Sequence, residues 1–100
     1  MRIGKVIGRV TLSQSLAPLK GARWLIVSPH GGEQLQDVQR PDLPLSAEPS
    51  LVVFDNLGGG VGDTIGFVEG REAASPFDEP PPIDVINTGL IDEIFYSPKR

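Results

Sequence analysis

The chain has 100 residues, which is enough for one domain with a single modest core and too few for two. It contains no cysteine and a single histidine, His30, which excludes disulfides, thiolate sites and histidine-based metal or catalytic clusters within one chain. The formal net charge of -4 argues against sequence-independent binding to nucleic acid, which depends on Lys and Arg neutralising phosphates, and no apolar run is long enough to span a bilayer.

The first forty residues predict two strands and a candidate third. Residues 2–12 alternate in polarity, as a half-buried strand does, and two glycines within them favour the bending that a small closed barrel requires. One face of this strand carries Val6, Val10 and Leu12, and the other carries Lys5, Arg9 and Thr11. Residues 13–22 read as a polar loop, and residues 24–27 as a core strand that ends at a turn. Residues 35–40 are a candidate for a short return strand.

The second half is organised around a dense run of glycines. Residues 51–54 and 65–68 have the composition of strands, and four glycines occupy the five positions 58–62 between them, so the pattern predicts a hairpin. Residues 70–74 favour a single helical turn, and residues 83–94 fit either a helix face or a strand. Several short strands separated by glycine and proline predict an all-β protein built as a small barrel.

Because glycine loses more backbone entropy on ordering than any other residue, the glycine run requires an explanation. A phosphate-binding loop would need a Lys-Ser/Thr pair, or a helix, directly after the glycines. Asp63 and Thr64 follow instead, and a strand pattern comes next, so this reading is disfavoured. A tight turn with no further role, and a loop crowded against symmetry-related copies of itself, stay open as alternatives.

Three blocks of the chain share a resemblance. They are residues 4–11 with 19–27, residues 55–65 with 69–74, and residues 82–94. Together they resemble the vertex proteins of bacterial microcompartments, the ethanolamine-utilisation/carboxysome (EutN/CcmL) family, in its opening strands, its glycine-rich signature and its C-terminal segment. The sequence departs from this pattern at Gly59, where the family usually has alanine, and in the acidic, proline-rich residues 75–82.

The resemblance implies a five-stranded OB-like β-barrel with one short helical turn, formed by residues 1–100 as a single domain and assembled as a cyclic homopentamer. It favours a strand for residues 83–94. It also implies a cytoplasmic, structural shell protein without cofactor, metal or catalytic residues, whose pentamers cap the vertices of a polyhedral microcompartment. Its partners would be hexameric shell proteins, with no nucleic acid and no membrane. The residues expected at a subunit contact near the ring axis are Asp55, Asn56, Leu57, Gly58, Gly59, Gly60, Val61 and Gly62.

Two other interpretations concern carboxylates and aromatic residues. Asp55 and Asp63 are the best candidates for an acid–base pair across the predicted hairpin, but a side chain of Asp55 that accepts hydrogen bonds and caps the glycine turn is favoured. An OB-like barrel could also bind single-stranded nucleic acid in a basic groove with stacked aromatics. Few aromatics and an acidic balance disfavour this alternative, and Trp24, which begins the apolar run 24–27, is expected in the core.

Overall fold

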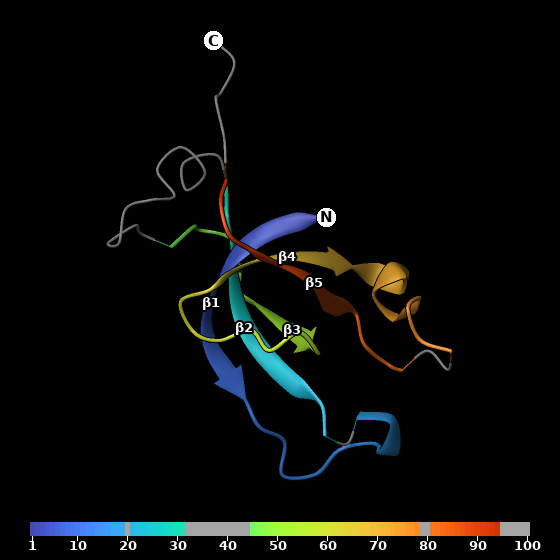
Figure 1. Ribbon diagram of the computed structural model, residues 1–100. Coiled ribbons are helices and arrows are strands. Elements are labelled where there is room, and N and C mark those ends of the chain that lie inside the picture. The colour runs from blue at the N-terminus through green and yellow to red at the C-terminus, as the bar shows by residue number, and fades with distance from the viewer. Residues whose placement is uncertain (20, 32–44, 79–80, 95–100) are drawn as a thin grey trace.

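A computed structural model describes residues 1–19, 21–31, 45–78 and 81–94 (Figure 1). The strands are β1 (Arg2–Val10), β2 (Arg23–Pro29), β3 (Leu51–Asp55), β4 (Thr64–Glu69) and β5 (Val85–Ile91), and the 3₁₀ turns are η1 (Ala17–Leu19) and η2 (Gly70–Ala74). The prediction of a mainly β protein with five strands is confirmed, and so is the helical turn at 70–74. η1, within the predicted polar loop, is an additional turn. The candidate strand at 35–40 lies outside the described residues. Within the described part of the chain, no helix is long and apolar enough to cross a membrane.

The five strands close into a barrel in the order β1-β2-β3-β5-β4. All neighbouring strands are antiparallel except β3 and β5, which are parallel. The predicted hairpin of β3 and β4 is therefore wrong, because β5 lies between them. Ile86 of β5 is opposite Phe54 on one side and Val68 on the other. The segment 56–63 is thus a connection between two strands that are not neighbours.

A bulge in β1 changes which of its side chains face the barrel interior. The register against β2 shifts between Val6 and Gly8, and Ile7 between them is partly exposed. Before the bulge, Gly4 and Val6 are buried, and a Cβ built on Gly4 would lie 2.7 Å from the carbonyl oxygen of Ser28, so only glycine fits this approach. After the bulge, Val10 is opposite Trp24 of β2, whereas Val6 is opposite Val27, and the side chains of Trp24 and Val27 lie on different faces of the barrel wall. β1 ends at Val10, and Leu12 is 47% exposed, so the predicted common face of Val6, Val10 and Leu12 is wrong beyond the bulge.

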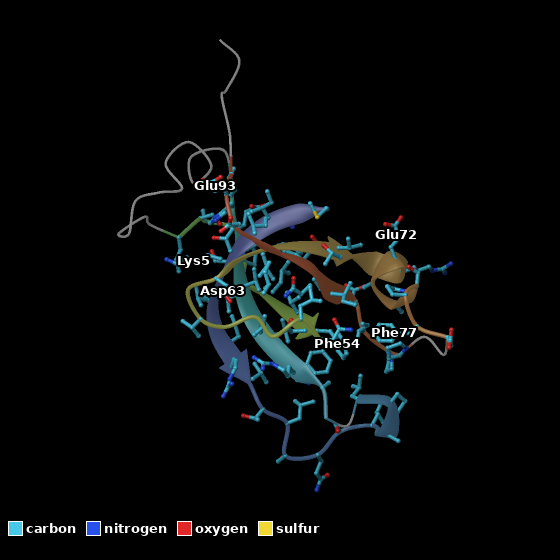
Figure 2. The ribbon with its side chains drawn as sticks, in the orientation of Figure 1. Lys5, Phe54, Asp63, Glu72, Phe77 and Glu93 are labelled. Carbon is cyan, nitrogen blue, oxygen red and sulfur yellow. The ribbon has the colours of Figure 1, made fainter. Side chains whose placement is uncertain are left out.

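Apolar side chains pack on both surfaces of the barrel wall. The interior holds a cluster of Val6, Leu25, Val27, Val53, Ile65, Phe67 and Val85. A second cluster forms around Phe54, Ala73 of η2 and Ile86, with Trp24 and Phe77 packed against it. The rings of Trp24 and Phe54 meet edge to face with their centroids 5.6 Å apart. Those of Phe54 and Phe77 (labelled in Figure 2) meet in the same way, also with centroids 5.6 Å apart. Trp24 is thus half-buried against this second cluster, while Leu25 beside it enters the interior.

Candidate functional site

The glycine-rich loop 56–63 runs from the end of β3 to the start of β4 and is held against the barrel at both ends. At its far end, the amide of Gly62 donates to the carbonyl of Val6 at 2.9 Å, and the amide of Val6 donates to the carbonyl of Asp63 at 2.8 Å. At its near end, Gly59 is buried, and a Cβ built on it would lie 3.0 Å from Cδ1 of Leu25. At its far end the loop therefore extends the pairing of β4 with β1, and near its other end it packs on the barrel core.

Asp55, the last residue of β3, fixes the first half of the loop. Its side chain is 1% exposed. Oδ1 accepts hydrogen bonds from the amide of Leu57 and from Nδ2 of Asn87, both at 2.9 Å, and Oδ2 accepts one from the amide of Gly59 at 2.8 Å. These bonds replace the water that a buried carboxylate loses. The interpretation of Asp55 as the cap of the glycine turn is confirmed.

Arg23 joins the same network from the first residue of β2. Its Nε lies 3.4 Å from Oδ2 of Asp55, and its Nη2 donates to the carbonyl of Gly59 at 2.7 Å. Asn87, in β5, in turn accepts from the amide of Gly89 at 3.0 Å. Sequence reasoning missed Arg23 and Asn87. The only signal for Asn87 was a polar residue within an apolar segment, and nothing in its neighbourhood pointed to Asp55, 32 positions away.

Asp63 holds the second half of the loop as a local turn. Its Oδ2 accepts from the amide of Gly60 at 2.8 Å, and its own amide donates to the carbonyl of Gly60 at 3.0 Å. Left-handed φ values occur at Gly58 (+84°) and Gly62 (+97°), where glycine is required. Gly60 has no positive φ, and the nearest atom to a Cβ built on it is Oδ2 of Asp63 at 4.0 Å. A positive φ, one reason for which a glycine run can be needed, is therefore not what requires glycine at position 60.

These contacts decide between the chemical interpretations of the loop. The amides of Leu57, Gly59 and Gly60 already donate to the protein's own carboxylates, so they are not directed at a phosphate. β4, not a helix, follows the loop. Asp55 and Asp63 serve separate halves of the loop, and the predicted hairpin that would have brought them together does not exist. Among the described residues, no group of three or more His, Asp or Glu side chains could hold a metal ion.

The outer surface of the loop is apolar and accessible. Asp55 and Gly59 are buried, Gly60 is half-buried, and the exposed members of the predicted set are Asn56, Leu57, Gly58, Val61 and Gly62. Leu57 is 47% exposed and Val61 is 68% exposed. Leu90, whose Cδ2 lies 3.5 Å from the position of a Cβ on Gly59, is 48% exposed. The loop thus exposes two large apolar side chains, Leu57 and Val61, and Leu90 of β5 adds a third beside Gly59.

The fold is similar to those of several solved microcompartment proteins. The pentameric shell protein of the RMM microcompartment is 27% identical with a TM-score of 0.77, and each chain is covered over 100% of its length. The GrpN pentameric microcompartment shell protein from Rhodospirillum rubrum is 25% identical with a TM-score of 0.77, covering 97% of this chain and 100% of that one. Gloeobacter violaceus CcmL is 24% identical with a TM-score of 0.79, covering 96% and 90%, a likeness of fold alone.

No curated protein sequence matches the chain significantly. The family model described as ethanolamine utilisation protein EutN/carboxysome matches residues 1–92, which is nearly the whole chain. The chain belongs to the EutN/CcmL family of ethanolamine-utilisation and carboxysome proteins.

Proposed function

We propose that this chain is a structural shell protein that assembles as a homopentamer and caps the vertices of a polyhedral bacterial microcompartment. Two solved proteins with the same fold, at 27% and 25% identity, are pentameric shell proteins. A head-to-tail contact that repeats around an axis closes into a ring when its rotation allows. A pentagonal tile introduces the curvature that a flat layer of hexagonal tiles lacks, so this function follows from shape and needs no catalytic group.

The glycine-rich loop is the observation that carries this proposal. Its backbone is fixed by Asp55, Arg23 and Asp63, while Leu57 and Val61 are left exposed. An ordered loop with exposed apolar side chains is suited to a contact with another subunit, since burial of those side chains stabilises the contact at about 25 cal/mol per Å². We place residues 55–62 at this contact, near the ring axis.

The proposed partners are further copies of this chain and hexameric shell proteins that meet the outer rim of the ring. Each contact with a hexamer can be weak, because a pentamer makes five identical contacts around its rim. This multivalency raises the overall affinity for the shell. This places the protein in a compartment shell within the bacterial cytoplasm.

Binding of single-stranded nucleic acid is the competing function, and the second apolar cluster disfavours it. Trp24 and Phe54 lie on the outer surface of β2 and β3, where aromatic side chains of an OB-like barrel could stack on bases. Phe54 is only 9% exposed, however, because Phe77 packs against it (Figure 2). The protein's own segment after η2 thus occupies this surface, and the net charge of -4 adds repulsion.

Native mass spectrometry of the purified chain in dilute neutral buffer tests the proposal. We expect the pentamer as the main species, because a ring of five closes all its contacts. A monomer or dimer as the main species would contradict it.

A further inference from the structure

A small hollow lies beside the end of β1 and the start of β2, where the pairing of the two strands ends. The last paired residues of the two strands are Val10 and Trp24. The lining residues are Arg9, Val10, Thr11, Ala22, Arg23 and Trp24, and the volume is about 170 Å³. Pockets that bury a drug-sized ligand measure roughly 300–1,000 Å³. This hollow therefore has room for one side chain, and not for a nucleotide or a larger cofactor.

The hollow is positively charged in a protein whose net charge is -4. Two of its six lining residues are arginines and none is acidic. Arg2 pairs with Glu48 and Glu69, and Arg23 pairs with Asp55. Arg9, in contrast, is exposed and makes no hydrogen bond or ion pair within the described part of the chain. Its planar set of N–H donors is thus available for a carboxylate, which it can bind through two parallel bonds.

The remaining walls combine donors with apolar surface. Thr11 is exposed and carries a hydroxyl. The indole N–H of Trp24 has no partner among the described residues, and no unpaired side-chain nitrogen or oxygen there is buried, so it reaches solvent. Val10 and the ring of Trp24 are half-buried and give an apolar surface. A free inorganic anion would use the donors alone, whereas a peptide would also cover the apolar wall.

We propose that this hollow binds an acidic peptide segment of a partner protein. Arg9 and Arg23 lie on one face of the β1–β2 pair, and Val10 and Trp24 lie on the other. A Glu or Asp side chain enters the hollow and its carboxylate pairs with Arg9 and Arg23, while the neighbouring part of the peptide passes the end of the strand pair and packs on Trp24 and Val10. The side chain of Arg23 is 45% exposed, and Asp55 and the carbonyl of Gly59 hold it in place, so one wall of the site is fixed before the peptide binds. All six lining residues lie outside residues 55–62, which we place at the subunit contact.

Trp24 is the sole tryptophan, so its fluorescence reports on the hollow directly. The assembled protein is titrated with a capped hexapeptide that contains Asp and Glu, with the same peptide carrying Asn and Gln in their place, and with sodium acetate. We expect a saturable change with the acidic peptide, and at least about tenfold weaker binding of the amide peptide, the size expected for loss of a charge-assisted hydrogen bond. Acetate should also bind at least about tenfold more weakly, because it leaves the apolar wall uncovered.

Arg9→Gln removes the charge with little change in length and should weaken the acidic peptide about tenfold. Arg71→Gln, on η2, is the matched control and should bind like the unchanged protein. Equal binding of the two peptides, an unaffected Arg9→Gln variant, equal binding of acetate, or tighter binding of single-stranded DNA than of the acidic peptide would each overturn the inference. Native mass spectra of the same samples show whether the pentamer is intact. An intact pentamer that does not bind the acidic peptide would contradict the proposed peptide site and leave the proposed pentameric shell protein unaffected.

Discussion

Arg23 and Asp55 face each other in register across β2 and β3, and together they hold both backbone polar groups of Gly59. Asp55 accepts from the amide of Gly59, Arg23 donates to its carbonyl, and the guanidinium and the carboxylate lie 3.4 Å apart. Asp55, the buried member of this pair, is the last residue of β3, and Arg23, the more exposed member, is the first residue of the neighbouring β2. The barrel therefore positions the loop directly, through two adjacent strands.

Asp55→Asn should destabilise the protein, because one buried acceptor oxygen becomes an N–H group that faces the amide of Gly59 and the guanidinium of Arg23. We expect the free energy of unfolding to fall by about 2–3 kcal/mol, the range for leaving buried donors unsatisfied. Urea denaturation at one fixed protein concentration measures it, since assembly makes stability depend on concentration. The control is Asp63→Asn, because the carboxylate of Asp63 is exposed. Its free energy of unfolding should fall by less than about 1 kcal/mol. Equal losses in the two variants would show that Asp55 has no special role.

Gly60→Val separates folding of the subunit from formation of the ring. Gly60 has no positive φ, and a Cβ there has no heavy atom of its own chain nearer than Oδ2 of Asp63 at 4.0 Å, so the barrel should tolerate a side chain. A crowded subunit contact should not. We therefore expect a native circular dichroism spectrum together with loss of the pentamer in native mass spectra.

The control for this variant is Gly21→Ala, outside the loop, which introduces a side chain at a positive φ with no neighbour within 4 Å. It should lower the stability of each subunit by about 1 kcal/mol through backbone strain. Normal pentamers formed by Gly60→Val would show that this loop does not lie at a crowded subunit contact.

The glycine loop also shows what could be predicted from sequence. Strand composition located β3 and β4, while residues 83–94 fitted a helix or a strand and only the family resemblance favoured the strand β5. The capping role of Asp55 followed from the short-range hydrogen bonding of an Asp beside a turn. Strand pairing could not be predicted in the same way, because insertion of β5 between β3 and β4 depends on residues more than twenty positions further along the chain. Arg23 and Asn87 were missed for this reason, since closure of the barrel brings both of them to Asp55.

His30 should make the stability dependent on pH. Burial, and to a smaller extent the positive charge of Lys5, lower the pKa of His30 from its ordinary value of 6.5. Below pH 6.5, His30 is protonated in the unfolded chain, but it stays neutral in the folded chain until the pH reaches the lowered pKa. Unfolding therefore takes up protons, and the folded state loses stability as the pH falls towards the lowered pKa. Above pH 6.5 this loss is absent. Thermal unfolding at about pH 7.5 and about pH 5.5 measures it.

His30→Gln is neutral at both pH values and should unfold at more nearly equal temperatures in the two buffers. The comparison uses the difference between the two buffers for each variant, so a general loss of stability from the substitution does not affect it. An equal decrease in both proteins would assign the pH dependence to the carboxylates instead.

The vertex assignment predicts what happens to whole shells. Shells of hexameric proteins produced with this chain should be closed polyhedra with extra density at their corners, because only a pentagonal tile closes a layer of hexagons there. Shells produced without it should be open at the corners and more permeable to small molecules. Electron microscopy and the entry of a small fluorescent dye measure the two effects. Gly60→Val, which should fold without forming rings, is the matched control and should behave like omission of the chain. Closed shells of unchanged shape and permeability without the chain, and no added density at the corners when it is restored, would contradict the assignment even for a pentameric protein.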